Sequence, residues 1–214
     1  MVVYLDKKAI LWSLEEFEFA QPKSPPSTAA AGLKDEQIEA GNAANKLDYV
    51  KPIASFKSSA ILTSVDAHPF NSDIFAFGSI DKYIRIYSAK ADRIIDWYQS
   101  EDYITSVNYA PDGRQLLVGF SHGLCRLYSL EPFLAFRCEV VCHNSNIREL
   151  DARNVVNTMF LENGSFIVNS SDSRVRLFSE TTSYQLEMKY KGHTSSGQLL
   201  RADSDKYPNI NLDN

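Results

Sequence analysis

The stretch Asp81-Lys82-Tyr83-Ile84-Arg85-Ile86-Tyr87 recurs in related form at three other places in the chain. The related stretches are Asp6-Lys-Lys-Ala-Ile-Leu-Trp12, His122-Gly-Leu-Cys-Arg-Leu-Tyr128 and Asp172-Ser-Arg-Val-Arg-Leu-Phe178. In each, a turn residue stands six positions before an aromatic residue. Tyr128 follows Tyr87 by 41 residues, and Phe178 follows Tyr128 by 50 because an insertion lies around residues 144–154. The chain is therefore built from structural repeats of about 40 residues.

Short runs rich in Ile, Val, Tyr, Phe and Thr lie around these stretches and are broken by Asp, Gly, Ser, Asn and Pro. Such runs, with no long helical pattern between them, predict an antiparallel all-β domain. A second shared segment, starting at Leu62, Ile104 and Val156, gives each repeat an inner strand. A middle strand, a third strand ending at the aromatic and an outer strand follow it. We predict strands at 74–77, 83–87, 93–98, 104–109, 115–118, 124–128, 136–142, 156–161, 166–169 and 175–178.

These repeats resemble the WD-repeat (WD40) β-propeller family over residues 1–15 and about 52–205. The family's Trp-Asp ending is degenerate here, since Ser13 follows Trp12, and its Gly-His signature survives at Gly192-His193. The resemblance implies a WD40-type β-propeller with about four blades' worth of four-stranded antiparallel sheets. Because seven such repeats need about 290 residues, we expect part of a seven-bladed ring, with a closed four-bladed ring or pairing with another chain as alternatives. The open edges of an incomplete ring would recruit other chains, so we expect that the isolated chain is not a well-behaved monomer.

The repeat boundaries divide the chain into six segments. We expect a partial first blade at 1–19, a low-complexity insertion at 20–51, blades at 52–99, 100–142 and 143–191, the last with a loop insertion, and the start of a further blade at 192–214. The low-complexity insertion is too poor in apolar residues to offset the cost of ordering it. Within it, Ser24 precedes Pro25 and is a candidate phosphorylation site.

The resemblance also implies roles for the repeated residues. In the family, the turn Asp, a Ser or Thr, a His and the Trp form a buried hydrogen-bond network, and here Asp81 and Asp172 match the Asp, with Ser79 and Ser170 as hydroxyl partners. Because the tryptophan is replaced, we expect the full network to be absent and these aspartates to cap tight turns. We assign the structural turn role to Asp6, Asp81 and Asp172, and the repeat aromatics are Trp12, Tyr87, Tyr128 and Phe178. The recurring arginines at 85, 126 and 176 are expected between blades, with their heads bonded to carbonyls.

A narrower resemblance concerns the WD-repeat proteins related to the Rab-GTPase-binding protein of recycling endosomes. It is carried by residues 79–87, 109–119, 170–178 and especially Met188-Lys-Tyr-Lys-Gly-His193. That subfamily also carries a Ser/Pro-rich insertion after an early blade. The resemblance implies a small GTPase of the Rab type as a partner. It also implies a cytoplasmic protein that associates peripherally with endosomal membranes through its partners.

Composition narrows the function. With 22 basic and 27 acidic residues the formal charge is -5, which argues against a nucleic-acid partner. The sequence contains no apolar stretch of the about 20 residues that a membrane span needs, so no transmembrane segment is predicted. The three cysteines, at 125, 138 and 142, are few and odd in number, which argues against a disulfide framework. Cys138, Cys142 and His143 have ligand chemistry for zinc, but the sequence offers no fourth ligand at a suitable spacing.

No catalytic motif, metal site or cofactor site is predicted, so we expect a non-enzymatic scaffold for protein–protein interactions. The alternative is an enzyme or small-ligand-binding protein built on a propeller frame. The loop insertion at 146–154 is the candidate partner-binding segment, because loop insertions on one face of a propeller commonly build its binding surface. Its contact candidates are Arg148, Glu149 and Arg153.

Overall fold

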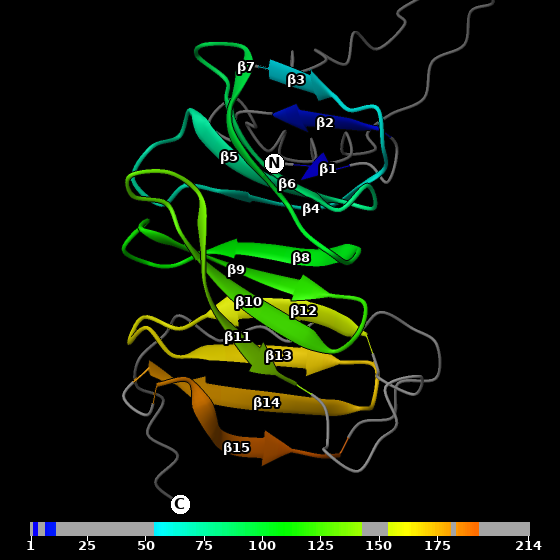
Figure 1. Ribbon diagram of the computed structural model, residues 1–214, viewed down its shortest axis with the longest axis vertical. Helices are drawn as coiled ribbons and strands as arrows, with labels where there is room; N and C mark the ends of the chain where they lie inside the picture. Colours follow the sequence, from blue (N-terminus) through cyan, green and yellow to red (C-terminus); the bar gives the residue numbers. More distant parts are fainter. Residues whose placement is uncertain (1, 4–6, 12–53, 143–153, 181–182, 193–214) are drawn as a thin grey trace, which may run out of the picture.

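The computed structural model describes residues 2–3, 7–11, 54–142, 154–180 and 183–192. In these residues, strands form four antiparallel sheets stacked along the long axis of the molecule (Figure 1). The first sheet contains β1 (Val2–Val3), β2 (Lys8–Leu11) and β3 (Ala54–Lys57). The second contains β4 (Leu62–Ala67), β5 (Ile74–Ser79), β6 (Tyr83–Ser88) and β7 (Arg93–Gln99). The third contains β8 (Ile104–Tyr109), β9 (Gln115–Phe120), β10 (Leu124–Ser129) and β11 (Ala135–Val141), and the fourth contains β12 (Val155–Phe160), β13 (Phe166–Ser170), β14 (Arg174–Ser179) and β15 (Gln185–Tyr190).

Each four-stranded sheet is a meander in which strands adjacent in sequence are also adjacent in space. The turn between the middle and third strands needs a left-handed residue, and Lys82, Gly123 and Ser173 supply it with φ of 71°, 73° and 59°. The fold class expected from the repeats, an all-β WD40-type arrangement of four-stranded sheets, is confirmed.

The pairing of β3 corrects one boundary. β3 bonds to β2, with Lys8 opposite Lys57 and Leu11 opposite Ala54, so it completes the first sheet. The second sheet begins at Leu62, which is later than the boundary expected at residue 52. β3 and β15 were also absent from the predicted strands. The inner strand expected near 199–202 lies outside the described residues.

Apolar clusters fill the spaces between sheets. Between the second and third sheets, Ile84, Ile104, Leu116 and Tyr128 are fully buried, and between the third and fourth, Leu127, Val155 and Phe166 are buried. The neighbouring inner strand lies so close to Gly78 and Gly119 that a Cβ there would overlap Ile104 or Val155. The sheets therefore pack directly on one another through their inner halves.

Polar side chains of the inner strands also join the sheets. Ser64 Oγ accepts a bond from the Val107 amide at 3.1 Å, and an oxygen of Asp66 accepts one from the Tyr109 amide at 2.7 Å. In the next pair of sheets, Thr158 Oγ1 lies 2.9 Å from Ser106 Oγ and donates to Asn108 Oδ1 at 2.7 Å. These contacts fix the offset between neighbouring inner strands.

Candidate functional site

The loops gather at two edges of the stack. One edge, on the right in Figure 1, is called the top face. It holds the turns between middle and third strands together with the connections from one sheet to the next, as the bond from Ser100 N to Lys82 O (2.8 Å) shows. The equivalent bond in the third sheet runs from Cys142 N to Gly123 O (2.9 Å). These bonds place the start of each connection beside a turn between middle and third strands. The bottom face holds the remaining loops, at 68–73, 89–92, 110–114, 130–134, 161–165 and 180–184.

An aspartate, a serine and an arginine form a cluster at the top face of the fourth sheet. Arg176 donates to Asp172 Oδ2 at 2.5 Å, and Ser170 donates to Asp172 Oδ1 at 2.6 Å. The side chains of Arg176 and Asp172 are only 2% and 7% exposed. Burial alone would raise the pKa of Asp172, but hydrogen bonds from Arg176 and Ser170 and the arginine charge outweigh it and lower that pKa to about 2.

The second sheet carries the same cluster in a more exposed form. Arg85 donates to Asp81 Oδ2 at 2.6 Å and to Ser79 Oγ at 2.9 Å, with side-chain exposures of 14% for Arg85 and 24% for Asp81. Asp81 Oδ1 also accepts the Tyr83 amide at 3.2 Å, which is a turn-capping contact. These hydrogen bonds hold the pKa of Asp81 below its ordinary value although partial burial acts to raise it.

The arginine contacts correct an expectation. The guanidinium groups of Arg85 and Arg176 bond to carboxylate and hydroxyl groups, not to backbone carbonyls. In both of these repeats the carboxylate partner lies four residues before the arginine, and this spacing was the overlooked signal. In the third sheet His122 replaces the aspartate, and Arg126 turns instead to Glu139 at 2.7 Å and Glu101 at 3.3 Å.

The described repeat aromatics lie inside the stack. Tyr87 is 3% exposed and packs against Phe56, with ring centroids 5.0 Å apart, while Tyr128 and Phe178 are buried. The Tyr87 hydroxyl bonds to Asp92 at 2.5 Å, and burial together with this contact raises the pKa of Tyr87 to about 12. The remaining candidates lie outside the described residues; they are Asp6, Trp12, Ser24, Arg148, Glu149 and Arg153.

The cysteines pack in apolar surroundings. Cys125 and Cys142 are buried and Cys138 is half-buried, all in the cluster between the third and fourth sheets. Burial raises the pKa of the Cys125 thiol. Among the residues that the structure describes, no group of three His, Cys, Asp or Glu side chains is placed to hold a metal ion. No helix of membrane-spanning length and apolarity occurs in that part of the chain.

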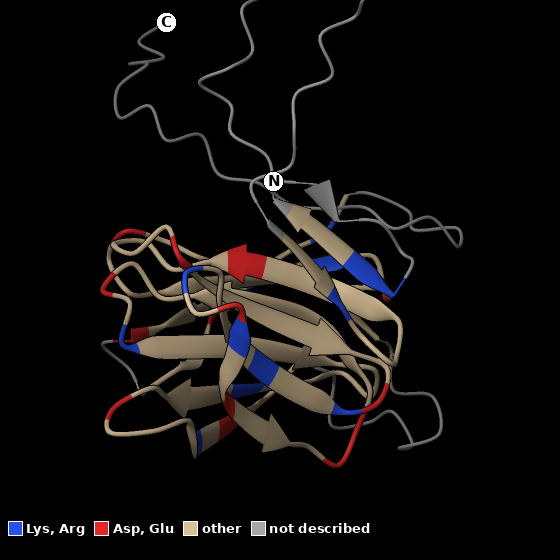
Figure 2. Ribbon diagram, turned by 90° about the horizontal axis from the view of Figure 1, so that it is seen from above, with Lys and Arg blue, Asp and Glu red and all other residues tan. Residues whose placement is uncertain are grey.

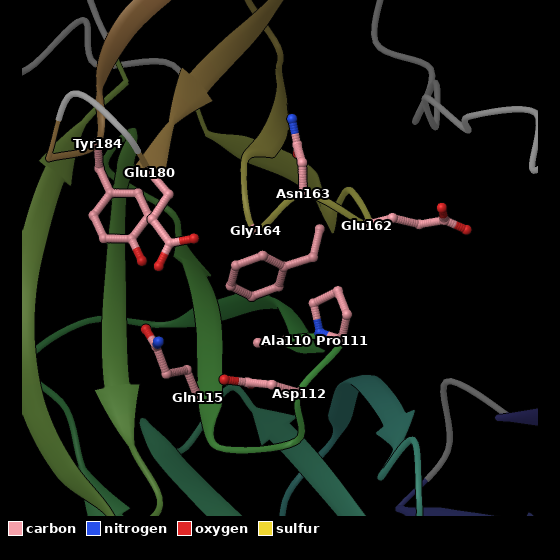
Figure 3. A pocket seen from close by; sticks show the side chains of 10 residues that line it. Ala110, Pro111, Asp112, Gln115, Glu162, Asn163, Gly164, Glu180 and Tyr184 are labelled. Atoms are coloured by element: carbon pink, nitrogen blue, oxygen red, sulfur yellow. The ribbon is translucent and has the colours of Figure 1, made fainter.

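The bottom face contains a groove between the third and fourth sheets, with a volume of about 320 Å³ (Figure 3). One wall is the 110–115 loop region and the other comes from residues 160–164, 180 and 184. Glu180 and Tyr184 point towards Asp112 and Gln115 across the groove, while Glu162 and Asn163 point away. We call this feature the seam groove; its lining residues are Ala110, Pro111, Asp112, Gln115, Phe160, Glu162, Asn163, Gly164, Glu180 and Tyr184.

Two local features shape the seam groove. Gly164 has φ of +78°, and a Cβ there would overlap the Glu180 carboxylate, so glycine permits both the turn and the close approach of Glu180. Tyr184 is half-buried and packs against Phe166 with ring centroids 5.4 Å apart and a tilted arrangement. Burial and the nearby Glu180 raise the pKa of the Tyr184 hydroxyl, which therefore stays protonated as a hydrogen-bond donor. The sequence analysis did not predict this groove.

Comparison with known proteins agrees with this architecture. Residues 94–129 match the family model "WD domain, G-beta repeat", a span that runs from β7 through the next three strands to the end of β10. An uncharacterized WD repeat-containing protein of Schizosaccharomyces pombe is 26% identical over 158 residues, which is 70% of this chain and 27% of that protein.

Two further relatives have other names. WD repeat-containing protein 44 of Xenopus laevis is 25% identical over 154 residues, covering 70% of this chain and 17% of that protein. A guanine nucleotide-binding protein subunit beta of Zea mays is 33% identical over 73 residues, covering 33% of this chain and 19% of that protein. The chain thus spans between 17% and 27% of the length of these relatives. The match of residues 94–129 to a WD40 repeat and the stacked four-stranded antiparallel sheets are together consistent with a partial β-propeller.

Proposed function

We propose that the chain acts as a non-enzymatic scaffold that mediates protein–protein interactions. The observation that carries this proposal is the seam groove, which is walled by loops of two sheets whose inner strands are bonded to each other. Rigidly spaced loops offer a partner a surface that requires little ordering on binding. The similarity to WD-repeat proteins supports the same class of function.

The loop between β11 and β12 is the second proposed contact region. Its neighbours Cys142 and Asn154 bond to Gly123 and Ser171, which belong to turns of the top face. Arg148, Glu149 and Arg153 are the proposed contact residues, and the arginines suit an acidic patch on a partner. Residues 143–153 and the seam groove would then serve different partners.

A narrower role in membrane trafficking rests on the resemblance of residues 170–178 and 188–193 to the endosomal Rab-binding subfamily. In this role a small GTPase of the Rab type is the partner, the protein is cytoplasmic and is recruited to endosomal membranes, and phosphorylation of Ser24 regulates it.

The alternative function is that the seam groove binds a small molecule, as in an enzyme or ligand-binding protein. The groove lies at the small end of the range for ligand pockets, which favours a single side chain of a protein partner.

The test is affinity capture with the 214-residue chain as bait, followed by direct binding measurements with each purified candidate. Arg148→Glu/Arg153→Glu is compared with the unchanged chain, and a thermal-shift screen against nucleotides and metabolites runs in parallel. Direct binding by at least one protein supports the scaffold function, and weaker binding by the charge-reversed variant assigns residues 143–153 to it. A specific thermal shift with a small molecule and no direct protein binder would overturn the proposal.

A further inference from the structure

We propose that the seam groove binds a cationic side chain, lysine or arginine, presented by an extended segment of the partner protein. This inference rests on the proposed scaffold function and names the chemistry of one of its contacts. Three properties of the groove carry it: unpaired negative charge, a buried acceptor without a donor, and apolar walls.

The first property is charge. Asp112, Glu162 and Glu180 line the groove, and in the part of the chain that the structure describes none of them makes an ion pair. The loops of the bottom face have the same sign, since they carry two basic residues, Lys90 and Arg114, against six acidic ones. The acidic residues are Asp73, Asp92, Asp112, Glu131, Glu162 and Glu180. Arg137 on β11 also acts on the groove, where its charge works to lower the pKa of Tyr184. Figure 2 shows Asp and Glu on several of these loops.

The second property is a buried acceptor at the groove wall. Gln115 Oε1 is shielded from solvent and receives no hydrogen bond from the described residues. A buried carbonyl oxygen without a donor has lost its hydration without a replacement hydrogen bond, so a ligand that supplies an N–H to it restores the missing interaction. The carboxylates of Asp112 and Glu180, which point into the groove, also accept hydrogen bonds without donating any. The group that best matches these oxygens therefore has several hydrogen-bond donors and a positive charge. An ammonium or guanidinium group meets that requirement.

The third property is the apolar lining that leads to these oxygens. Pro111, Phe160 and Tyr184 contribute apolar surface beside the carboxylates. Lysine and arginine carry an aliphatic stem behind a charged head, so the stem can lie on this surface while the head reaches the oxygens. An adjacent aromatic ring adds attraction for the cation. The carboxylates would repel a small anion, and a purely apolar side chain would match the apolar surface alone.

The experiment uses the isotope-labelled 214-residue chain and follows backbone amide shifts in NMR titrations. The probes are pentapeptides with lysine, arginine, norleucine or glutamate at the centre and glycine elsewhere, blocked at both ends. We expect saturable shifts at Asp112, Gly164 and Tyr184 with the lysine and arginine peptides only. Asp112→Asn/Glu180→Gln should weaken binding about tenfold or more, because it removes both carboxylates that point into the groove.

Glu187→Gln is the control for the loss of one carboxylate outside the groove, because Glu187 is exposed on β15 and does not line the groove. It should keep the binding constant within about twofold, since a distant exposed charge is screened by salt. Equal weakening in this control would mean general charge attraction and would overturn the inference. So would equal binding of the norleucine peptide, or shifts confined to other surfaces. Each of these results leaves the scaffold function intact, because that function is tested by direct binding of captured proteins.

Discussion

The buried ion pair of the fourth sheet yields a quantitative prediction. Asp172→Ala removes the carboxylate that accepts bonds from Arg176, Ser170 and Arg174. The Arg176 guanidinium, 2% exposed, is then left without its counter-charge. Breaking a buried pair in this way costs about 3 to 5 kcal/mol of unfolding free energy, which lowers Tm by on the order of 10 °C in a chain of this size.

The equivalent change in the second sheet is the matched control. Asp81→Ala leaves Arg85 at 14% exposure, where water can solvate the freed charge, so we expect a loss of only about 1 to 2 kcal/mol. Adding Arg176→Met to Asp172→Ala should restore more than half of the lost stability, because no buried charge remains. Urea unfolding at pH 7 compares the three variants with the unchanged chain. Equal losses for the two aspartates, or a double variant no more stable than Asp172→Ala, would refute the reasoning.

The same pair makes stability depend on pH. The pKa of Asp172 is about 2 in the folded chain against an ordinary value of 3.8, so the ionised form is favoured by folding. Its contribution, about 2 kcal/mol from the difference of the two pKa values, is complete above pH 3.8 and disappears as pH falls through 2. Asp172→Asn should remove this component of the acid-induced loss of stability. Unfolding curves of both proteins between pH 5 and pH 2 measure it, and parallel curves would contradict the assignment.

Three further predictions concern the seam groove, the low-complexity insertion and the exposed side chains of β15. Gly164→Ala should cost about 1 to 2 kcal/mol in a urea titration because its φ is +78°. Deleting residues 22–48 should leave Tm nearly unchanged, since halving a loop changes its closure free energy by only about 0.6 kcal/mol, and loss of cooperative melting would show that this segment packs into the domain. Met188→Lys/Tyr190→Lys should reduce self-association in sedimentation velocity, because these side chains on the last sheet are each 48% exposed, and a wild-type chain that is already monomeric would contradict this expectation.

The repeats predicted most of the fold because their signal is periodic. The predicted 104–109 strand coincides with β8, and the other predicted strands differ from the observed ones by one or two residues at an end. β3 was missed because Ala54–Lys57 is four residues long and directly follows the low-complexity insertion. No range was predicted for β15, although Gln185–Tyr190 alternates polar and apolar residues strictly, which is a strand signal, and it is the outer strand expected in that repeat.

The candidate site was much less predictable than the fold. The seam groove combines residues from three separate loops, and its Asp112, Asn163 and Gly164 are residue types that tight turns commonly contain. No local pattern distinguishes a turn that lines a groove from one that does not. The arginine clusters did have a local signal, since Asp81 and Asp172 both stand four residues before an arginine.

The way in which adjacent sheets are joined bears directly on what the seam groove can recognise. Thr158 on the inner strand of the fourth sheet bonds both Ser106 and Asn108 of the third, so the two walls cannot slide without breaking buried hydrogen bonds. The core consequently fixes the spacing of the inner strands beside the two walls that carry Asp112 and Glu180. A ligand that needs both carboxylates at once must match the spacing between them, and lysine and arginine can be discriminated by it because their donors are arranged differently.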